Sequence, residues 1–422
     1  MLRLTWFEIK KLLGKKWLWI LLAAVILLEN QTVIVTAVRY SENLRYQRNV
    51  LQNYSEFGGA LTEEKYNRIQ SELSAAEKEY NEDLNKALAS PGKFMQTRAE
   101  DYTFLIGLKS QAEYILKADK DARAVVEQAN LNDSLFSESG NAYKANQNKL
   151  IASTFPTGLN LDLLPGEGTL LRFGVDMNLL IILLVFFLYP IFSGEHENRL
   201  YPILFSTVRG RRRVVFSKAL AAVCVAAGVY LLSALSRCAF EAPFGGFHCF
   251  GAPVQSLQYF ARCPFPLTIG GCFLLQCALQ CFGFLVFALL CTFLSSLFRQ
   301  SYFSLALSLL LGLSVYGVYS FLMNPSASLQ IHYPEDQFRS FFSFVRRWLF
   351  FGLFKPEVYF TGFLDTRIGP FSVFAVLTAA AASLLFAILF IALTYLIYTR
   401  QFQFSLRFHS HKRVGKTNAV SI

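Results

Sequence analysis

The chain has 422 residues, of which 54% are hydrophobic and 16% are charged, and its net charge is +11. A soluble domain of this length needs a larger charged fraction to cover its surface, so the composition excludes an ordinary soluble protein. The positive charge does not require nucleic acid as a partner, because residues 39–172 carry a balance of −3 and the rest of the chain carries +14. Anionic membrane lipids at the cytoplasmic flanks account for this asymmetry.

Apolar residues collect in six runs of about 20 residues, the length that a helix needs to cross a hydrocarbon core about 30 Å thick. These runs must be helical because the core holds no water to satisfy an open backbone. The expected spans are residues 17–38, 175–193, 215–236, 270–296, 302–323 and 371–398. The sequence therefore predicts an all-α polytopic membrane protein with six transmembrane helices. The first run has no small-residue cleavage site, so we expect it to remain as a span.

Lys and Arg in the short loops predict the orientation in the membrane. They number 17 on the side of the N-terminus and 7 on the opposite side. Because short loops rich in Lys and Arg stay in the cytoplasm, we expect both termini there, in the cytoplasmic membrane of the cell. Arg346 and Arg347 on the opposite side depart mildly from the rule.

The first sixteen residues predict an interfacial helix. Leu2, Trp6, Ile9 and Leu13 fall within a narrow arc of a helical wheel, and the lysines of this segment lie off that arc. Such a helix lies flat on the cytoplasmic leaflet before the chain enters the first span. The alternative is that these lysines only set the topology.

About 135 residues of soluble composition separate the first two spans and predict an extracytoplasmic helical domain between them. Apolar residues recur at three- and four-residue spacing along 62–90, and a second helical stretch covers 94–129. An antiparallel helical hairpin is the expected arrangement. Residues 131–172 are rich in Asn, Ser, Gly and Pro, and we expect them to form a loop-rich return to the membrane.

The predicted organisation has four parts. They are residues 1–38 (interfacial helix and first span), 39–172 (extracytoplasmic domain), 173–400 (spans two to six, with a coupling loop at 194–214) and 401–422 (a basic cytoplasmic tail). The outer loop at 338–351 is too short and too charged to span the membrane, and its aromatics suit an interfacial or re-entrant element.

No constellation of catalytic residues is present, so we expect neither an enzyme nor a cofactor. The five histidines lack metalloprotease spacing, and Gly415-Lys416-Thr417 lacks the leading glycine of a phosphate-binding loop. Most cysteines lie in spans, where a thiol is usually a small packing residue, and no metal site is expected. Cys238, Cys249 and Cys263 fall in an outer loop, and a disulfide there could join any two of them.

Polar residues inside the spans are candidates for lining a translocation path, because they are costly in the membrane. Glu29 lies in the outer half of the first span, and Gln276 and Gln280 lie one turn apart in the fourth. The alternative for the two glutamines is interhelical hydrogen bonding. For Glu29, the alternative is that the span ends early.

The loop after the second span combines an apolar patch with charged flanks. Residues 200–205 are mostly apolar and must be covered by the membrane, by the protein itself or by a partner. Glu195 and Glu197 precede the patch and the basic turn 209–213 follows it, which argues against deep burial in lipid. The alternative is a basic, topology-setting loop whose apolar residues are incidental.

This order of residues, with Lys218 entering the third span, resembles the ABC type-2 membrane-permease family. There an acidic residue closes the second span, a short coupling helix docks into a groove on a separate ATPase subunit, and a Lys begins the third span. On that resemblance, the ATPase-coupling residues are expected to be Glu195, Glu197, Leu200, Tyr201, Ile203, Leu204, Phe205, Arg209 and Arg211.

The resemblance implies the permease subunit of an ABC exporter, partnered by a cytoplasmic ABC ATPase subunit and by a second permease subunit, identical or different. The large first outer loop suits one branch of the family. A membrane receptor or scaffold with a ligand-sensing ectodomain is the alternative, and it needs no ATPase. A secondary transporter is a third option, but the sequence shows no paired interrupted spans in two repeated halves.

Overall fold

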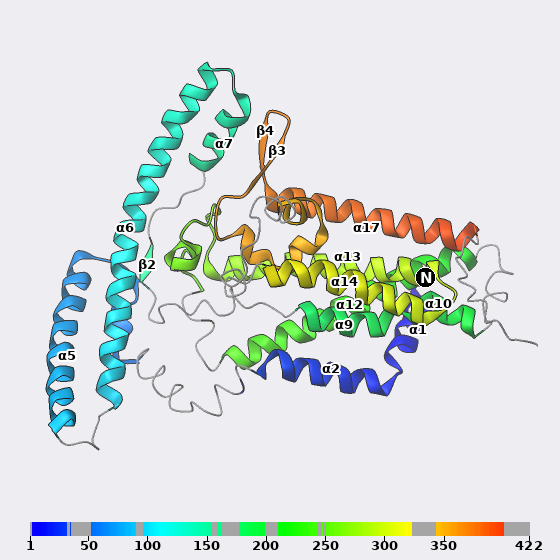
Figure 1. Cartoon of the computed structure of the whole chain (residues 1–422), viewed down its shortest axis with the longest axis horizontal. Helices are drawn as coiled ribbons and strands as arrows, with labels where there is room; N and C mark the ends of the chain where they lie inside the picture. The colour runs from blue at the N-terminus through cyan, green and yellow to red at the C-terminus, as the bar shows by residue number, and fades with distance from the viewer. Residues whose placement is uncertain are drawn as a thin grey trace, which may run out of the picture.

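The computed structural model is built almost entirely of helices (Figure 1). It describes residues 2–31, 34, 52–89, 96–152, 159–161, 177–198, 210–242, 247, 250–322 and 343–400. Long apolar helices lie side by side in a bundle, and a separate helical domain stands across one end of it (Figure 1). The all-α prediction is confirmed.

The bundle helices follow the apolar runs of the sequence. They are α2 (Lys16–Glu29), α9 (Met177–Leu188), α10 (Pro190–Glu197), α12 (Gly210–Glu241), α13 (Ile269–Leu297), α14 (Ser301–Leu322) and α17 (Ala375–Arg400). Within the described residues, four stretches are long and apolar enough to cross a membrane: Met177–Glu197, Arg212–Glu241, Ile269–Leu297 and Ala375–Thr399. The chain is therefore built to lie in a membrane through at least these helices.

The prediction of six spans includes two, the first and the fifth, that are not among these four helices. Helix α2 has 14 residues and Asn30 follows it as its C-cap, so the expected continuation to residue 38 extends beyond the described part. Helix α14 matches the fifth expected span in its bounds, and its apolar described part is Ser301–Ser314. The first and fifth spans stay predictions. The last helix begins at Ala375 rather than 371, because residues 371–374 form a strand.

Helix α13 is the centre of the bundle. It contacts α10, α12, α14 and α17, and most of its second half is buried. Glycine allows a close approach on one face: a Cβ at Gly283 would lie 3.0 Å from the Leu353 Cβ and 3.1 Å from the Phe350 carbonyl oxygen. The segment that approaches there consists of two 3₁₀ turns, η5 (Phe350–Phe354) and η6 (Pro356–Tyr359).

These 3₁₀ turns follow a short helix at 343–348 and place an aromatic cluster inside the bundle. Phe350, Phe351 and Phe354 are buried and make ring contacts with one another. Phe351 and Phe354 also contact the ring of Phe287 in α13. The 338–351 segment was predicted to be interfacial or re-entrant; its described part packs between helices, and residues 338–342 lie outside the described part.

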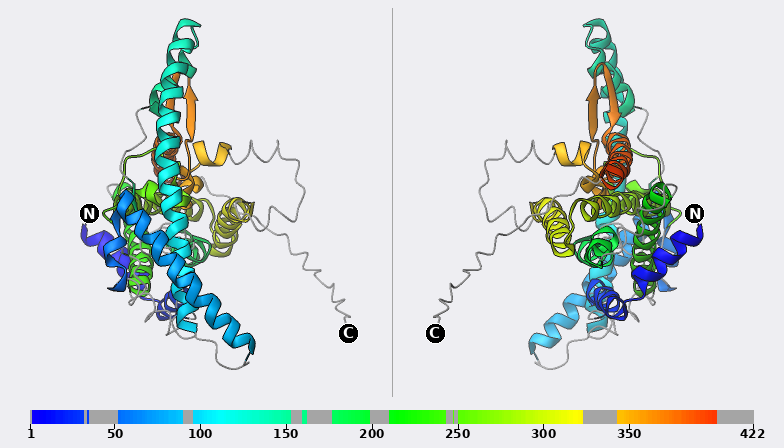
Figure 2. Two further views of the ribbon diagram at one scale, coloured as in Figure 1. Left: turned by 90° about the vertical axis from the view of Figure 1, so that its left-hand side faces the viewer. Right: turned by 90° about the vertical axis from the view of Figure 1, so that its right-hand side faces the viewer.

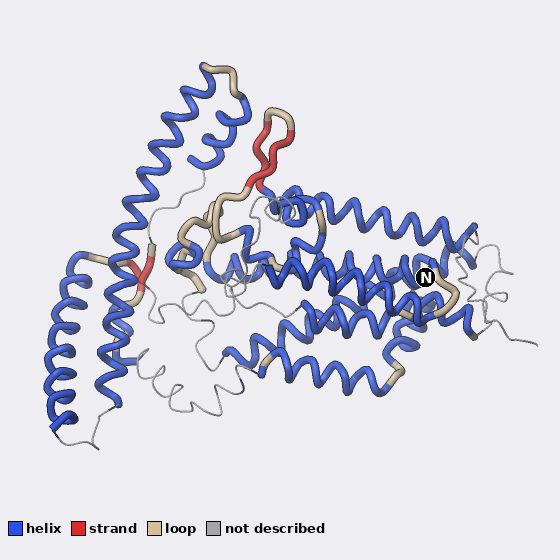
Figure 3. Tube along the Cα trace, viewed as in Figure 1, coloured by secondary structure: helices blue, strands red, loops and turns tan. Residues whose placement is uncertain are grey.

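The domain between α2 and α9 in the chain is a helical hairpin with a third helix. It consists of α5 (Glu63–Ala89), α6 (Gln96–Glu138) and α7 (Ala142–Ala152), with a small antiparallel sheet of β1 (Gly59–Ala60) and β2 (Asn160–Leu161). We call these residues the inserted domain. Figure 3 shows how completely helix dominates it. Its apolar core contains Phe57, Ile69, Leu105, Leu108 and Leu161.

The antiparallel hairpin of α5 and α6 was predicted and is confirmed, and the Thr62 hydroxyl caps α5 by accepting from the Lys65 amide at 3.3 Å. The loop-rich return at 131–172 was wrong for its first part. Helix α6 continues to Glu138, and α7 follows after a turn at Gly140, whose φ is +73°. Asn and Ser lower helix propensity by only tenths of a kcal/mol each, so an established helix runs through them until a glycine ends it.

Helix α1 (Leu2–Leu13) lies at the end of the bundle opposite the inserted domain (Figures 1 and 2). Trp6 and Leu2 are exposed, while Thr5, Glu8 and Leu12 are buried against the bundle. The predicted helix is therefore present, and an acidic residue lies on its buried face.

Candidate functional site

A buried lysine near the start of α12 is the centre of the candidate site. Lys218 is 0% exposed, and its Nζ lies 2.5 Å from the Glu195 Oε1 of α10. The same ammonium donates to the backbone carbonyl of Ile191 and lies 4.9 Å from the centre of the Phe192 ring. A buried charge is tolerated only when it is paired and hydrogen-bonded, and these contacts meet that requirement.

Helix α1 contributes the other two charges of the network. The Glu8 Oε2 lies 4.0 Å from the Lys218 Nζ, and the Lys11 Nζ lies 3.7 Å from the Glu195 Oε1. Two carboxylates and two ammonium groups therefore balance each other. We call Glu8, Lys11, Glu195 and Lys218 the charge network. It joins α1 to α10 and α12, which follow much later in the chain.

The second acidic residue of α10 binds a different helix. The Glu197 carboxylate accepts from the backbone amide of Ser301 at 2.7 Å and from its hydroxyl at 2.8 Å. Ser301 begins α14, where amides lack partners in the helix and the helix dipole favours a negative charge. The Ser193 hydroxyl also donates to the Ser301 hydroxyl at 3.1 Å. The end of α10 is thus tied to α14 as well as to α1 and α12.

The coupling residues predicted between these two helices lie outside the described residues. They are Leu200, Tyr201, Ile203, Leu204, Phe205 and Arg209, together with the side chain of Arg211. The structure does describe both helix ends that lead into this segment. On one side stands α10 with Glu195 and Glu197, and on the other stands α12 with Lys218.

The three residues predicted for a translocation path contact α12 or their own helix. The Gln280 side chain is buried, accepts from the Tyr230 hydroxyl at 3.1 Å and donates to the Phe354 carbonyl at 2.9 Å. The Gln276 amide donates to the Cys272 sulfur at 3.4 Å. The Gln280–Tyr230 bond is the interhelical kind that the alternative expects, whereas the Gln276 bond lies within α13. The role of the two glutamines in a path stays a prediction.

Glu29 belongs to a separate polar cluster near the far end of α2. Its carboxylate accepts from the Ser233 hydroxyl, and its backbone carbonyl accepts from the Arg237 guanidinium at 3.0 Å. Arg237 also pairs with Glu241 at 2.8 Å. Helix α12 thus bonds to Glu29 of α2 through Ser233 and to Gln280 of α13 through Tyr230. The two predicted path residues therefore link α12 to two different helices.

Glu8, Arg237 and Glu241 were missed by sequence reasoning. A single acidic residue in an amphipathic, lysine-rich segment is the usual pattern of a solvated face. Nothing in the local pattern marked Glu8 as buried. Arg237 and Glu241 stand four residues apart, which is the spacing of a helical ion pair, and this signal could have indicated them.

The cysteines offer no described cross-link or metal centre. Cys238 and Cys263 are free, so they are not joined to each other, and Cys249 lies outside the described residues. Among the side chains that the structure describes, no three His, Cys, Asp or Glu come together in a way that could hold a metal ion.

A family model described as ABC-2 family transporter protein matches residues 2–401 of the chain. Comparisons with curated proteins and with solved structures found no match. The family match includes the bundle helices, the inserted domain and α1, and it agrees with the resemblance seen in the loop after the second span. The chain therefore belongs to the ABC-2 transporter family, and it is an integral membrane protein of that family.

Proposed function

We propose that the chain is the permease subunit of an ATP-driven exporter whose ATPase is a separate cytoplasmic subunit. Family membership supports a permease that works with an ABC ATPase. We further propose that residues 200–205 form the coupling segment that docks on this ATPase. In this proposal both termini are cytoplasmic, the inserted domain is extracytoplasmic, and a second permease subunit completes the translocation unit.

The charge network is the observation that supports the coupling assignment. A segment that transmits motion from an ATPase must be attached to the membrane helices through stiff ends. Glu195 and Lys218 stand on the two helices that lead into the segment, and their side chains meet at 2.5 Å in a buried environment. An ion pair that is deprived of water holds its geometry better than an exposed one, because separating it would leave buried charges without partners.

Helix α1 extends this support to the membrane surface. Glu8 and Lys11 bind the same ion pair from a helix whose other face exposes Leu2 and Trp6. An exposed aromatic and aliphatic face beside lysines suits the interface of an anionic leaflet. We propose that α1 rests on the cytoplasmic leaflet and holds the two helix ends at a constant depth.

The proposed cycle follows from these parts. ATP binding brings the ATPase subunits together and moves the coupling segment, and α10 and α12 pass the motion to the bundle, which alternates between inward-facing and outward-facing states. A polypeptide, an antimicrobial peptide or a lipid would suit the inserted domain and the aromatic cluster around Phe350.

The test is co-purification of the detergent-solubilised protein with an ATPase. The test variant is Leu204→Asp with Phe205→Asp. The matched control is Leu131→Asp with Leu135→Asp, because these two leucines are exposed on α6 at the opposite end of the molecule. We expect the ATPase to co-purify with the wild type and with the control, and to be lost from the test variant while its elution profile stays unchanged.

Two outcomes contradict the proposal. If the control variant loses the ATPase as completely as the test variant does, the coupling assignment fails. If no ATPase accompanies the wild type, the exporter assignment fails and a receptor or scaffold becomes the better description.

A further inference from the structure

Among the described residues, the inserted domain contacts the bundle at two junctions, which differ in their packing. The first joins it to the loop 250–268, which leads into α13. The Tyr114 hydroxyl of α6 donates to the Gln255 carbonyl at 2.7 Å, and the Asn160 amide of β2 donates to the Ser256 hydroxyl at 2.9 Å. Gln255 and Ser256 are 3% and 0% exposed, and the Gln255 side chain donates to two carbonyls of its own loop. This junction rests on a packed core.

The second junction joins α7 to a hairpin of β3 (Asp365–Ile368) and β4 (Phe371–Phe374). The Asp365 Oδ2 is its centre: it accepts from the Tyr143 hydroxyl at 2.7 Å, the Gln147 side chain at 3.3 Å and the Ser372 hydroxyl at 2.7 Å. Two of these donors come from α7 and one from the hairpin itself. Hydrogen bonds from uncharged side chains to one carboxylate therefore hold α7 in place.

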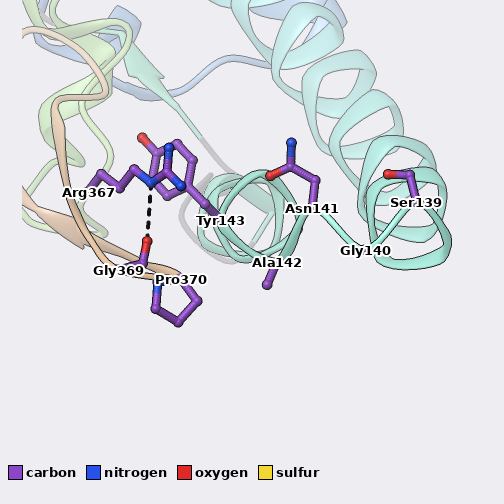
Figure 4. Close-up of a pocket in the computed structure, with 8 residues that line it drawn as sticks. All are labelled: Ser139, Gly140, Asn141, Ala142, Tyr143, Arg367, Gly369 and Pro370. Carbon is purple, nitrogen blue, oxygen red and sulfur yellow. Dashed lines mark hydrogen bonds between the residues drawn. The ribbon is translucent and has the colours of Figure 1, made fainter.

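This second junction borders a cavity that is open to solvent, although Asp365 itself is buried. A cavity of about 440 Å³ lies beside it, lined by the turn 139–143 and by Arg367, Gly369 and Pro370 (Figure 4). Arg367 lies over the Tyr143 ring, 5.0 Å from its centre, and Asn146 donates to the Pro370 carbonyl at 3.0 Å. Water that enters such a cavity can replace these hydrogen bonds one by one, which lowers the cost of separating the two surfaces.

The hairpin is rigidly continuous with α17. The Ala375 amide at the start of the helix donates to the Leu364 carbonyl at 2.9 Å, and the hydroxyls of Thr366 and Thr378 lie 3.0 Å apart. Strand and helix therefore share hydrogen bonds at their boundary, and the hairpin must follow α17. Of the four described helices that are long and apolar enough to cross a membrane, α17 is the least buried by the rest of the described structure.

The two junctions thus attach one domain to two different helices, α13 through the loop and α17 through the hairpin. The loop also packs on the hairpin, with the Phe265 and Phe374 ring centres 4.7 Å apart, so a movement of α17 relative to α13 at this end of the bundle strains one junction or the other. We propose that the α7–hairpin junction is a releasable latch, which opens when α17 moves in the transport cycle, and that the Tyr114 junction is a fixed anchor. This proposal rests on the proposed exporter function.

A matched pair of tyrosines allows the latch and the anchor to be compared directly. Tyr143 reaches the hairpin and Tyr114 reaches the loop, each through its ring hydroxyl. Each is replaced in turn by p-azidophenylalanine in the full chain purified with its ATPase, and the protein is illuminated with and without a trapped ATP state. Cross-linked peptides are quantified by mass spectrometry, from residue 143 to 365–374 and from residue 114 to 250–268.

We expect the cross-link from position 143 to fall at least about fivefold in the ATP-trapped state, while the cross-link from position 114 changes less than about twofold. Illumination before ATP is added should also lower ATP turnover in the position-143 protein and leave the position-114 protein close to its unilluminated rate. ATP turnover before illumination reports the proposed function by itself, so a failure there is distinguishable from a failure of the latch.

Three results would overturn the latch. The first is that position 143 does not cross-link to the hairpin even without nucleotide. The second is that its cross-link persists unchanged in the ATP-trapped state, and the third is that both positions lose their cross-links together. The last result would mean that the whole domain moves away as one body.

Discussion

The two ends of the bundle attach neighbouring segments by different chemistry. At the end that carries α1, Lys218 and Glu195 form a buried ion pair to which Glu8 and Lys11 add. At the opposite end, the inserted domain is attached through hydrogen bonds from uncharged donors, of which those to the Asp365 carboxylate border an open cavity. Buried ion pairs are costly to separate, whereas hydrogen bonds beside a water-filled cavity can exchange a partner for water. The comparison indicates a stiff end and an adjustable end.

The largest effect is expected from Lys218→Met. The substitution removes the buried cation from Glu195 and Glu8 and leaves Glu195 only the half-exposed Lys11, so it should lower the free energy of unfolding by about 3–5 kcal/mol. Denaturant unfolding in detergent, followed by tryptophan fluorescence, measures this change. The double variant Lys218→Met with Glu195→Leu should recover part of the loss, because it also removes a stranded carboxylate. A loss of stability no larger than that of a surface substitution would show that the network is not stiff.

The next effect concerns Cys263, in the loop that forms the Tyr114 junction. Burial raises the pKa of its thiol from 9.0 to about 11, so native protein at pH 8 should react with iodoacetamide about a hundredfold more slowly than unfolded protein. Because the unfolded thiol loses its proton first, this group's contribution to stability is present below pH 9 and is lost as the pH rises toward 11. Peptide mass spectrometry of labelled protein measures the rate. Rapid native labelling at pH 8 would contradict a packed loop.

Matched tyrosine variants compare the two junctions of the inserted domain. Tyr114→Phe leaves the carbonyl of buried Gln255 without its donor and should cost about 1–3 kcal/mol, while Tyr143→Phe leaves Asp365 with its other donors and should cost about 1 kcal/mol or less. Hydrogen exchange of 250–268 in the first variant and of Ala142–Ala152 in the second reports the local loss. Equal effects at both positions would remove the distinction between anchor and latch.

The smallest effect is expected from Lys11→Ala. Lys11 is 45% exposed and lies 3.7 Å from Glu195, so its removal should lower the free energy of unfolding by less than about 1 kcal/mol. The same denaturant assay applies, and added salt should reduce the difference further. A cost as large as that of Lys218→Met would mean that the exposed part of the charge network contributes as much as its buried part.

Much of the fold could be predicted because its signals are local. The apolar runs 175–193, 215–236 and 270–296 correspond to described helices that are long enough to span a membrane. The hairpin of α5 and α6 was predicted from the three- and four-residue spacing along 62–90 and from the second helical stretch that follows it. The continuation of α6 to Glu138 was missed because composition suggested a loop, while helix propagation depends on the residues already in the helix.

The candidate site could be predicted only in part. Glu195, Glu197 and Lys218 were identified from the order of residues around the second span. Their order did not reveal that Lys218 pairs with Glu195, or that Glu197 instead caps α14. Glu8 could not be found, since it lies far from the loop in sequence and only the packing of α1 on α12 brings it to the ion pair.

The sequence by itself determined that this protein lies in a membrane, that its long apolar runs are helical and which loop resembles a coupling loop. These properties depend on the length and spacing of apolar residues within one segment. Only the tertiary structure decided which charges are buried and paired, and which two helices the inserted domain contacts. A residue is buried by neighbours from distant parts of the chain, so a local sequence pattern cannot predict which charges are buried.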